Sequence, residues 1–196
     1  MKRFFDIIFS LIFLILFSPL FIFIVLAIKL FDRGPVFYRA PRVGKGGTLF
    51  RMFKFRTMVV NADWIGGSST ADDDPRITRV GKWLRKSKLD EFPQLFNVLL
   101  GDMSIVGPRP EVKEYVDMFS EEEKIILSVR PGMTDWASVW NPGEGKILQG
   151  SSDPDKTYLE KVRPEKIRLQ MKYVKEQSLW TDLQIIGSTL KILLRI

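Results

Sequence analysis

The feature of the sequence that most limits the fold is an apolar run near the N-terminus. Residues 7–28, IIFSLIFLILFSPLFIFIVLAI, contain no charged residue, and Ser10 and Ser18 are the polar ones. As one straight helix the run would be roughly 33 Å long, enough to cross the hydrocarbon core of a bilayer. It is too long for the apolar core of a signal peptide, and no small-residue cleavage site follows it. The run therefore predicts a retained membrane anchor.

Two properties of this run favour a bent helix over a straight crossing. Pro19 has no backbone N–H, and its ring clashes with the carbonyl of Ile15, which kinks a helix. The Ser18 hydroxyl can bond a carbonyl one turn earlier and soften that loss. Both flanks are basic, with Lys2 and Arg3 before the run and Lys29, Arg33, Arg39 and Arg42 after it. A helix that crosses the membrane would leave one of these basic ends outside, against the positive-inside tendency. We expect residues 1–33 to form a re-entrant helix–break–helix anchor, broken at Ser18 and Pro19, with both ends in the cytoplasm. A Pro-kinked spanning helix is the alternative.

Composition narrows the chemistry. The chain has 196 residues, which allows one domain beside the anchor. It carries 30 Lys and Arg against 23 Asp and Glu, a net charge of +7, which favours anionic partners. It contains no Cys and no His, which excludes disulfides, thiolate nucleophiles and imidazole catalysis. Any proton transfer falls to carboxylates, lysine, tyrosine or solvent.

Residues 34–196 have the pattern of a small α/β-mixed, helix-rich domain. Two extended segments within 34–58 flank a glycine-rich turn at 44–47, which predicts a β-hairpin. Residues 61–75 predict a mobile loop, and residues 80–100 and 154–176 predict helices, with Pro164 in a first turn. The C-terminal stretch carries an apolar stripe at helical spacing, and that helix either packs on the domain or lies in the plane of the lipid headgroups. The stripe comprises Leu179, Leu183, Ile186, Leu190, Leu193 and Leu194.

The residues that indicate chemistry lie in TRVGKWLRKSKLDEFPQLFNVLLGDMSIVGPRPE, residues 78–111. The adjacent carboxylates Asp90 and Glu91 follow a dense basic run. Pro93 fits best in the first turn of a helix, so the pair is expected at a helix N-terminus, with Ser87 as a candidate cap. The helix dipole and nearby cations favour ionised carboxylates there. The basic residues are Arg76, Arg79, Lys82, Arg85, Lys86 and Lys88.

This arrangement suits phosphoryl transfer. An ionised Asp can attack phosphorus and form an aspartyl phosphate, and a second carboxylate can help to hold a divalent cation. Arg109 lies between Pro108 and Pro110, which suits a guanidinium that binds phosphate in a fixed direction, and Arg130 before Pro131 repeats the arrangement more weakly. The alternative is structural: a capping box followed by a solvated basic face.

KLDEFPQLFNVLLGDMSIVGPRPE closely resembles the signature of the bacterial sugar transferases, the monotopic polyprenyl-phosphate phosphoglycosyl transferases. KRFFDIIFSLIFLILFSPL, GPVFYRAPRVGKGGTLFRMFKFRTM and DPRITRVGKWLRKSKLDE resemble neighbouring blocks of that family. The resemblance implies transfer of a sugar-1-phosphate from a UDP-sugar to undecaprenyl phosphate, with release of UMP. That reaction is the first membrane step in making a surface glycan such as O-antigen, capsule or exopolysaccharide, or a glycoprotein glycan.

The resemblance also assigns roles. It makes Asp90 the nucleophile on the β-phosphate, and the lipid phosphate then attacks the phosphosugar–Asp90 intermediate. Glu91 supports Mg²⁺ binding, with Asp90 as a second ligand, or proton handling, and both roles stay open. The domain at 34–196 is then cytosolic and catalytic, on the cytoplasmic face of the bacterial inner membrane. The cations expected around the phosphates are Lys54, Arg85, Arg109 and Arg130.

The same resemblance gives the expected partners: UDP-sugar, undecaprenyl phosphate, membrane phospholipid, a second copy of the chain and downstream glycosyltransferases, with no nucleic acid. The segment GMTDWASVWN, 132–141, departs from the common Gly-x-Thr-Gly-x-x-Gln pattern, because Asp135 replaces Gly and Ser138 replaces Gln. A particular sugar is therefore not carried over. Two rival hypotheses are a non-catalytic, membrane-anchored basic module that binds anionic lipid or RNA, and a one-step phosphotransferase without a covalent intermediate.

Overall fold

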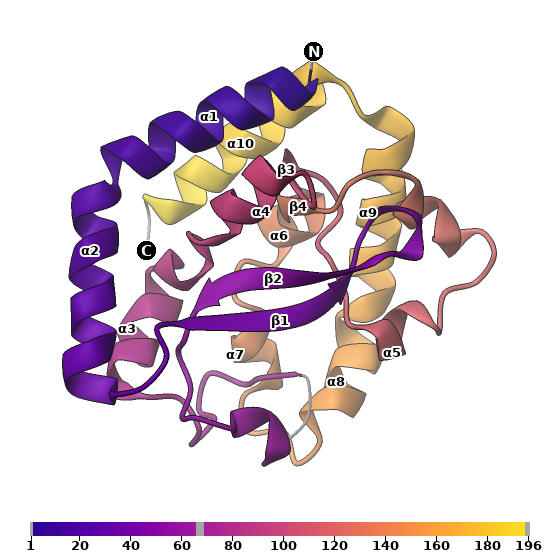
Figure 1. Cartoon of the computed structure of the whole chain (residues 1–196). Helices are drawn as coiled ribbons and strands as arrows, with labels where there is room; N and C mark the ends of the chain where they lie inside the picture. Colours follow the sequence, from indigo (N-terminus) through magenta and orange to yellow (C-terminus); the bar gives the residue numbers. More distant parts are fainter. Residues whose placement is uncertain (1, 66–68, 195–196) are drawn as a thin grey trace.

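A computed structural model describes residues 2–65 and 69–194 (Figure 1). The chain is α/β-mixed and helix-rich, as the sequence predicts. Within these ranges there are two small sheets, the antiparallel pair β1–β2 and the parallel pair β3–β4. The strands are β1 (Phe37–Val43), β2 (Leu49–Phe55), β3 (Ser104–Val106) and β4 (Gly132–Thr134). The α-helices are α1 (Lys2–Leu16), α2 (Ser18–Ala27), α3 (Arg79–Lys86), α4 (Gln94–Leu100), α5 (Lys113–Val116), α6 (Trp136–Trp140), α7 (Glu144–Leu148), α8 (Pro154–Lys161), α9 (Arg163–Glu176) and α10 (Leu179–Leu193).

The N-terminal run is broken where the sequence predicts. Helices α1 and α2 meet at a bend of 63°, and a π-helical turn, Ile28–Asp32, continues α2. The Ser18 hydroxyl donates to the carbonyl of Ile15 (2.8 Å), the bond expected beside a proline that cannot donate. Within the described ranges, α1 and α2 each fall short of a membrane span, and only together does the bent pair have the length and composition for one.

Both ends of the bent pair contact the same body. Near the start of α1, Arg3 donates to the carbonyls of Val98 and Leu99 (2.5 and 3.1 Å), at the C-terminal end of α4, where the helix dipole favours a cation. Past the end of α2, Arg56 donates to the carbonyl of Arg33 (2.7 Å). Figure 1 shows α1 and α2 wrapping around one corner of the molecule. The body therefore fixes both ends of the run.

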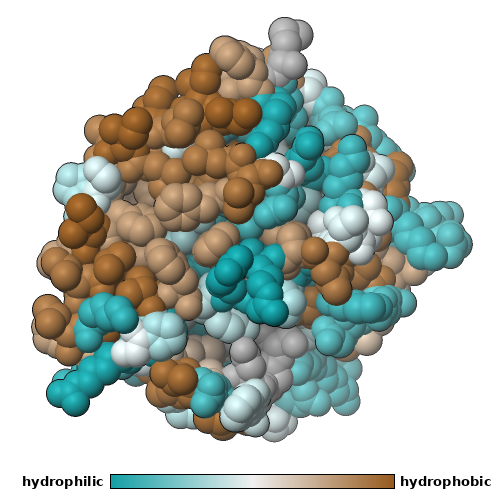
Figure 2. Space-filling model, in the orientation of Figure 1, coloured by the Kyte–Doolittle hydropathy of each residue, from teal (hydrophilic) through white to brown (hydrophobic). Residues whose placement is uncertain are grey.

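The surface over α1 and α2 is apolar (Figure 2). Many of the large apolar side chains of these helices are exposed to solvent, in contrast to the polar right-hand side of the same view. Helix α10 lies beside α1 in Figure 1, and Lys2 of α1 pairs with Asp182 of α10 (2.5 Å). The exposed apolar side chains of the pair and its π-helical turn include Phe4, Phe5, Leu11, Ile12, Ile15, Leu16, Ile22, Phe23, Leu26, Leu30 and Phe31.

The predicted β-hairpin is confirmed. Strands β1 and β2 pair antiparallel, and a 3₁₀ turn at Lys45–Gly47 joins them. Gly46 and Gly47 have φ of 67° and 79°, in the left-handed region that favours glycine, so the sequence of this turn matches its backbone. Asn97 of α4 then ties β2 to the body, since its amide donates to the carbonyl of Arg51 (2.9 Å).

The predicted helices are also present, with two corrections. The helical segment near 80–100 is divided into α3, a 3₁₀ turn at Leu89–Glu91, and α4. Ser87 does not cap the turn that follows: it is the C-cap of α3, and its hydroxyl donates to the carbonyl of Trp83 (2.9 Å). Lys88 adopts φ of 59°, and this left-handed residue redirects the chain into the turn that carries the carboxylates. Pro164 lies in the first turn of α9, as predicted.

Residues 61–75, predicted to be a mobile loop, hold a short 3₁₀ helix at Ala62–Trp64, and Arg76 bonds Asp74 next to it (2.7 Å). Residues 66–68 of that prediction lie outside the described residues. The C-terminal helix packs on the body through Ile185, which is fully buried, while Trp180 and Leu194 are exposed. Packing on the domain, one of the two alternatives for this helix, is therefore confirmed for one face. The other face is exposed, and its position among lipid headgroups stays a prediction.

The parallel pair β3–β4 has no counterpart in the sequence-based prediction. Each strand has three residues, too few for a recognisable period. The pair depends on two glycines: a Cβ on Gly132 would lie 2.0 Å from the backbone nitrogen of Gly107, so only glycine allows this approach. This contact brings the loop that carries Arg109 against the segment that precedes α6.

Candidate active site

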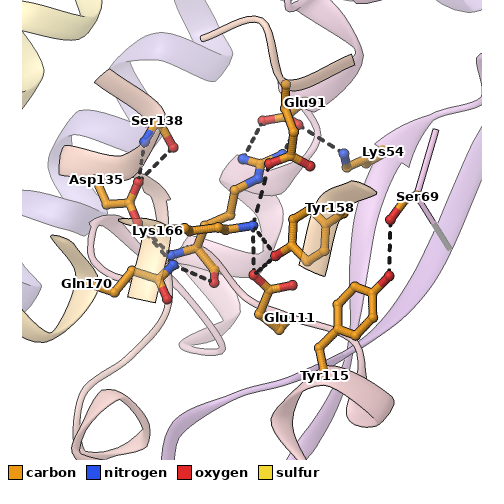
Figure 3. A network of polar contacts seen from close by, with 12 residues as sticks. Lys54, Ser69, Glu91, Glu111, Tyr115, Asp135, Ser138, Tyr158, Lys166 and Gln170 are labelled. Carbon is orange, nitrogen blue, oxygen red and sulfur yellow. Dashed lines mark hydrogen bonds and ion pairs between the residues drawn. The ribbon is translucent and has the colours of Figure 1, made fainter. Parts of the chain in front are cut away.

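Glu91 is the centre of a tight ion cluster (Figure 3). It lies in the 3₁₀ turn before α4, and Lys54 on β2 donates to its Oε1 (2.9 Å). Arg109 contacts both carboxylate oxygens: Nη1 donates to Oε2 (3.0 Å) and Nη2 to Oε1. This two-point contact fixes the guanidinium plane as well as its charge. Both oxygens of Glu91 are thus engaged by cations.

Asp90 has a different environment although it is the adjacent residue. Its side chain is buried, and in the described part of the chain its carboxylate accepts no hydrogen bond. Lys54 and Arg85 lie close enough to act on its charge, and Arg85 is itself held by Thr57, whose hydroxyl accepts from Nε (3.0 Å). The carboxylate that could react is therefore the one that accepts no hydrogen bond from the described residues.

The pKa values of the two carboxyls are shifted in opposite directions. Burial raises the pKa of Asp90, and Lys54 counters this only in part. Burial also works to raise the pKa of Glu91, but Arg109 and Lys54 outweigh it and hold that pKa well below its usual range. The cations act on both carboxyls as the sequence predicts, but at Asp90 burial outweighs them, and the sequence does not reveal burial.

The structure brings together three of the four predicted phosphate-binding cations. Lys54, Arg85 and Arg109 surround the Asp90–Glu91 turn. Burial lowers the pKa of Lys54 and of Arg85, whereas Glu91 raises the pKa of Arg109. Arg130 lies outside this cluster: its Nε donates to the carbonyl of Gly101 (2.8 Å), just after α4, and its side chain is exposed. The proline next to an arginine was too weak a signal to place Arg130.

The main chain of Arg109 is held by residues from two other elements. Its N–H donates to Oδ2 of Asp135 (3.0 Å), and its carbonyl accepts from the Nε2 of Gln170 on α9 (3.2 Å). Asp135 is the N-cap of α6, and its Oδ1 accepts from both the backbone N–H and the hydroxyl of Ser138 (2.7 Å each). Asp135, which stands where the family commonly has glycine, therefore helps to hold the backbone of Arg109.

A second buried network lies on the other side of Arg109 and was not predicted. Lys166 on α9 pairs with Glu111 (2.6 Å) and donates to the hydroxyl of Tyr158 (3.0 Å). Burial opposes the charge of Lys166, but Glu111 and Glu144 raise its pKa well above the ordinary value. Charged and polar residues on a helix usually face solvent, so neither Lys166 nor Gln170 carried a signal in the sequence.

A pocket of about 480 Å³ connects this cluster with the N-terminal and C-terminal helices. Its polar part includes Glu91, Arg109 and Lys166. Its other part is apolar and lies between α1 and α10. The pocket therefore offers charged groups and an apolar wall to one ligand or to two neighbouring ones. The apolar lining includes Phe9, Phe13, Ile186, Leu190 and Leu193.

In the described ranges, no three Asp, Glu, His or Cys residues converge as a metal site. The donor set is the Asp90–Glu91 pair. Mg²⁺ is commonly bound by one or two carboxylates together with water and substrate phosphates. The pair fits that mode of binding but not a site built from protein ligands alone.

A comparison with protein families identifies the family of this chain. The family model described as "Bacterial sugar transferase" matches residues 1–196. The chain belongs to this family. The match confirms the resemblance seen in the sequence, and it covers the segments that carry Asp90, Glu91 and Arg109.

Curated relatives of the chain differ in length and in sugar. It is 41% identical, over 98% of its length and 43% of the relative, to the UDP-N-acetylgalactosamine-undecaprenyl-phosphate N-acetylgalactosaminephosphotransferase of Aeromonas hydrophila. It is 38% identical, over its full length and 40% of the relative, to the undecaprenyl-phosphate galactose phosphotransferase of Salmonella typhimurium. It is 35% identical, over 96% of its length and 83% of the relative, to the exopolysaccharide production protein ExoY of Sinorhizobium fredii. The chain thus spans about two fifths of the first two relatives.

Proposed function

We propose that the protein transfers a sugar-1-phosphate from a UDP-sugar to undecaprenyl phosphate and releases UMP. The observation that carries the proposal is the buried Asp90 carboxylate, without a hydrogen-bond partner in the described chain, beside Lys54, Arg85 and the Glu91–Arg109 pair. The names of the relatives favour this reaction, since several are phosphotransferases that act with undecaprenyl phosphate. They do not favour a basic module without activity.

In the proposed first step, an Asp90 carboxylate oxygen attacks the β-phosphorus of the UDP-sugar. The bond from that phosphorus to the oxygen bridging the α-phosphate breaks, and UMP leaves with that oxygen. In the second step, an oxygen of the lipid phosphate attacks the same phosphorus, and the bond to Asp90 breaks. The product is a polyprenyl diphosphate sugar, and Asp90 returns to its carboxylate form.

The cations and Glu91 have separate roles in this proposal. Lys54, Arg85 and Arg109 stabilise charge on the phosphate oxygens. Glu91 orients Arg109 and Lys54, which both donate to it and lower its pKa. Its Oε1 accepts from both cations, whereas Oε2 accepts from Arg109 Nη1 and keeps a lone pair that could meet Mg²⁺. Mg²⁺, held by the carboxylate pair with substrate phosphates, would neutralise charge on the transferred group.

We propose a monotopic placement on the cytoplasmic face of the bacterial inner membrane. Two observations support it: the body contacts both ends of the bent pair, and the exposed apolar side chains gather over α1 and α2. A straight crossing would separate those two ends by the thickness of the bilayer. The apolar part of the pocket, between α1 and α10, supports a substrate with a lipid tail.

The direct test is a reconstitution. Purified protein is incubated with a panel of UDP-sugars, Mg²⁺ and undecaprenyl phosphate, and UMP and the lipid product are measured. We expect at least one UDP-sugar to yield UMP and a polyprenyl diphosphate sugar in equal amounts. Binding of anionic vesicles without UMP from any sugar would support the basic-module hypothesis instead.

A further inference from the structure

The backbone N–H and carbonyl of Arg109 are both held by buried side chains, Asp135 and Gln170, which Figure 3 labels. Asp135 accepts from the N–H (3.0 Å), and Gln170 donates to the carbonyl (3.2 Å). Gln170 also donates to Asp135 (3.2 Å), so the two side chains form one unit. Both have 0% exposure. A loop residue whose neighbours are Pro108 and Pro110 already has little freedom, and this unit removes what is left.

Asp135 does more than cap a helix. Its carboxylate is fully buried, and all the donors it meets are neutral: the Ser138 N–H and hydroxyl, the Arg109 N–H and the Gln170 amide. Burying a carboxylate is costly unless its hydrogen bonds are satisfied, and two donors at Ser138 would suffice for a cap. The bonds from Arg109 and Gln170 link that cap to the active-site loop.

We propose that Asp135 and Gln170 are positioning residues for the transfer reaction. They fix the Arg109 peptide so that the guanidinium meets Glu91 and the transferred phosphate in one orientation. This inference rests on the proposed function for its kinetic consequence, but the fixed peptide itself does not. It assigns a role to the residue at which the chain departs from the usual family pattern, and to a glutamine on α9.

Two variants remove this support in different ways. Asp135→Asn keeps the size of the side chain but turns one acceptor oxygen into a donor, which then faces another donor. Gln170→Met keeps the length and loses the donor to the Arg109 carbonyl and to Asp135, whereas Oε1 of Gln170 has no partner within the described residues, so its loss leaves no donor unpaired. Asp153→Asn is the matched control: Asp153 also caps a helix, accepting from Lys156 (3.0 Å), but is exposed.

The first measurement is hydrogen exchange in the peptide at 107–111 and needs no activity. Pro108 and Pro110 have no N–H, so the peptide reports few amides and the Arg109 amide can be followed. We expect its exchange to accelerate about tenfold or more in Asp135→Asn and to stay unchanged in Asp153→Asn. Unchanged exchange in a folded Asp135→Asn protein would overturn the inference. If that variant does not fold, the same comparison is made with Gln170→Met.

The second measurement is a double-mutant cycle on UMP release, with the UDP-sugar that the wild type uses. We expect Asp135→Asn to lower kcat roughly 10- to 100-fold, with a much smaller change in KM. In an Arg109→Ala background the same substitution should cost less than about twofold, because its effect passes through Arg109. Full additive losses would overturn the positioning role. Absence of UMP from the wild type would refute the proposed function and leave the exchange experiment decisive for the inference.

Discussion

Asp90 and Glu91 are neighbours in the chain, yet the fold gives them opposite chemistry. Glu91 is bound by two cations and stays ionised, whereas Asp90 is buried with no hydrogen-bond donor in the described chain. This difference suits the two proposed roles. A nucleophile such as Asp90 needs an accessible lone pair, whereas a residue that orients cations, such as Glu91, needs a fixed charge. The difference arises because Lys54 on β2 and Arg109 both lie against Glu91. The adjacent letters Asp-Glu in the sequence do not predict which of the two carboxylates these cations contact.

We predict that Asp90→Asn makes the fold more stable at neutral pH while removing UMP release. The folded pKa of Asp90 is raised, so its ionisation opposes folding: the free energy of unfolding falls as pH rises through the unfolded pKa, about 4, toward the folded value. The variant lacks this penalty. Thermal unfolding should show a higher Tm than wild type at pH 7 and no difference well below pH 4.

Asp74 gives the opposite control. The Arg76 side chain, through its hydrogen bonds to Asp74, lowers the pKa of Asp74, so that ionisation stabilises the fold above the unfolded pKa. Asp74→Asn should therefore lower Tm at pH 7, with the loss fading as pH falls through the folded pKa. Equal effects of the two Asn variants would contradict the electrostatic account of Asp90.

We predict that Arg109→Lys is severe. Lysine lacks the planar fork that binds both oxygens of Glu91, so one contact and the fixed orientation are lost. We expect a loss of about 2 kcal/mol in transition-state stabilisation, roughly 30-fold in kcat/KM for UMP release. Arg168→Lys, at an exposed surface pair with Glu165, is the control and should change little. An unchanged kcat/KM in Arg109→Lys would make Arg109 peripheral.

At the scale of elements, the sequence predicts what depends on local pattern. The break at Ser18 and Pro19, the hairpin with its glycine turn and the proline at the start of α9 follow from backbone preferences of single residues. The parallel pair β3–β4 and the support of Arg109 depend on contacts between segments far apart in the chain. Their residues have no local signature, which is why Gln170 and Lys166 were missed.

We predict that Gly132→Ala disrupts the site through β3–β4. A methyl group there would lie 2.0 Å from the backbone nitrogen of Gly107, so the strands must separate and the Arg109 loop must move. We expect a lower Tm and loss of UMP release. Gly187→Ala on α10 is the control: it meets no atom within 4 Å and should raise stability by about 0.5–1 kcal/mol. Normal activity in Gly132→Ala would show that the loop does not need this approach.

We predict that both ends of the α1–α2 pair are on the cytoplasmic side. The chain has no native cysteine, so Lys2→Cys and Pro35→Cys can be labelled one at a time in intact cells with a membrane-impermeant reagent. Neither should react until the inner membrane is opened. Reaction of one site alone in intact cells would establish a crossing. Replacing Ser18 and Pro19 with Ala and Leu should favour that crossing and lower activity.

For the whole molecule, one pocket joins the charged cluster to the apolar wall formed by α1 and α10. The pocket is lined by Glu91, the neighbour of Asp90, so it borders the site at which we propose that the nucleotide sugar and the lipid phosphate react in turn. The sequence predicts the parts of this arrangement, an anchor and a charged motif, but their relative placement depends on the tertiary contacts of Arg3 and Arg56.

The central claim is that Asp90 becomes covalently linked to the sugar phosphate. The most direct test is mass spectrometry of protein rapidly quenched after mixing with UDP-sugar and Mg²⁺, without lipid phosphate. We predict release of UMP and a mass increase of one sugar phosphate on the peptide that contains Asp90, both absent in Asp90→Asn. Steady-state kinetics with both substrates should give parallel double-reciprocal lines. Intersecting lines, with no adduct on Asp90, would contradict the account and indicate direct transfer between the two substrates.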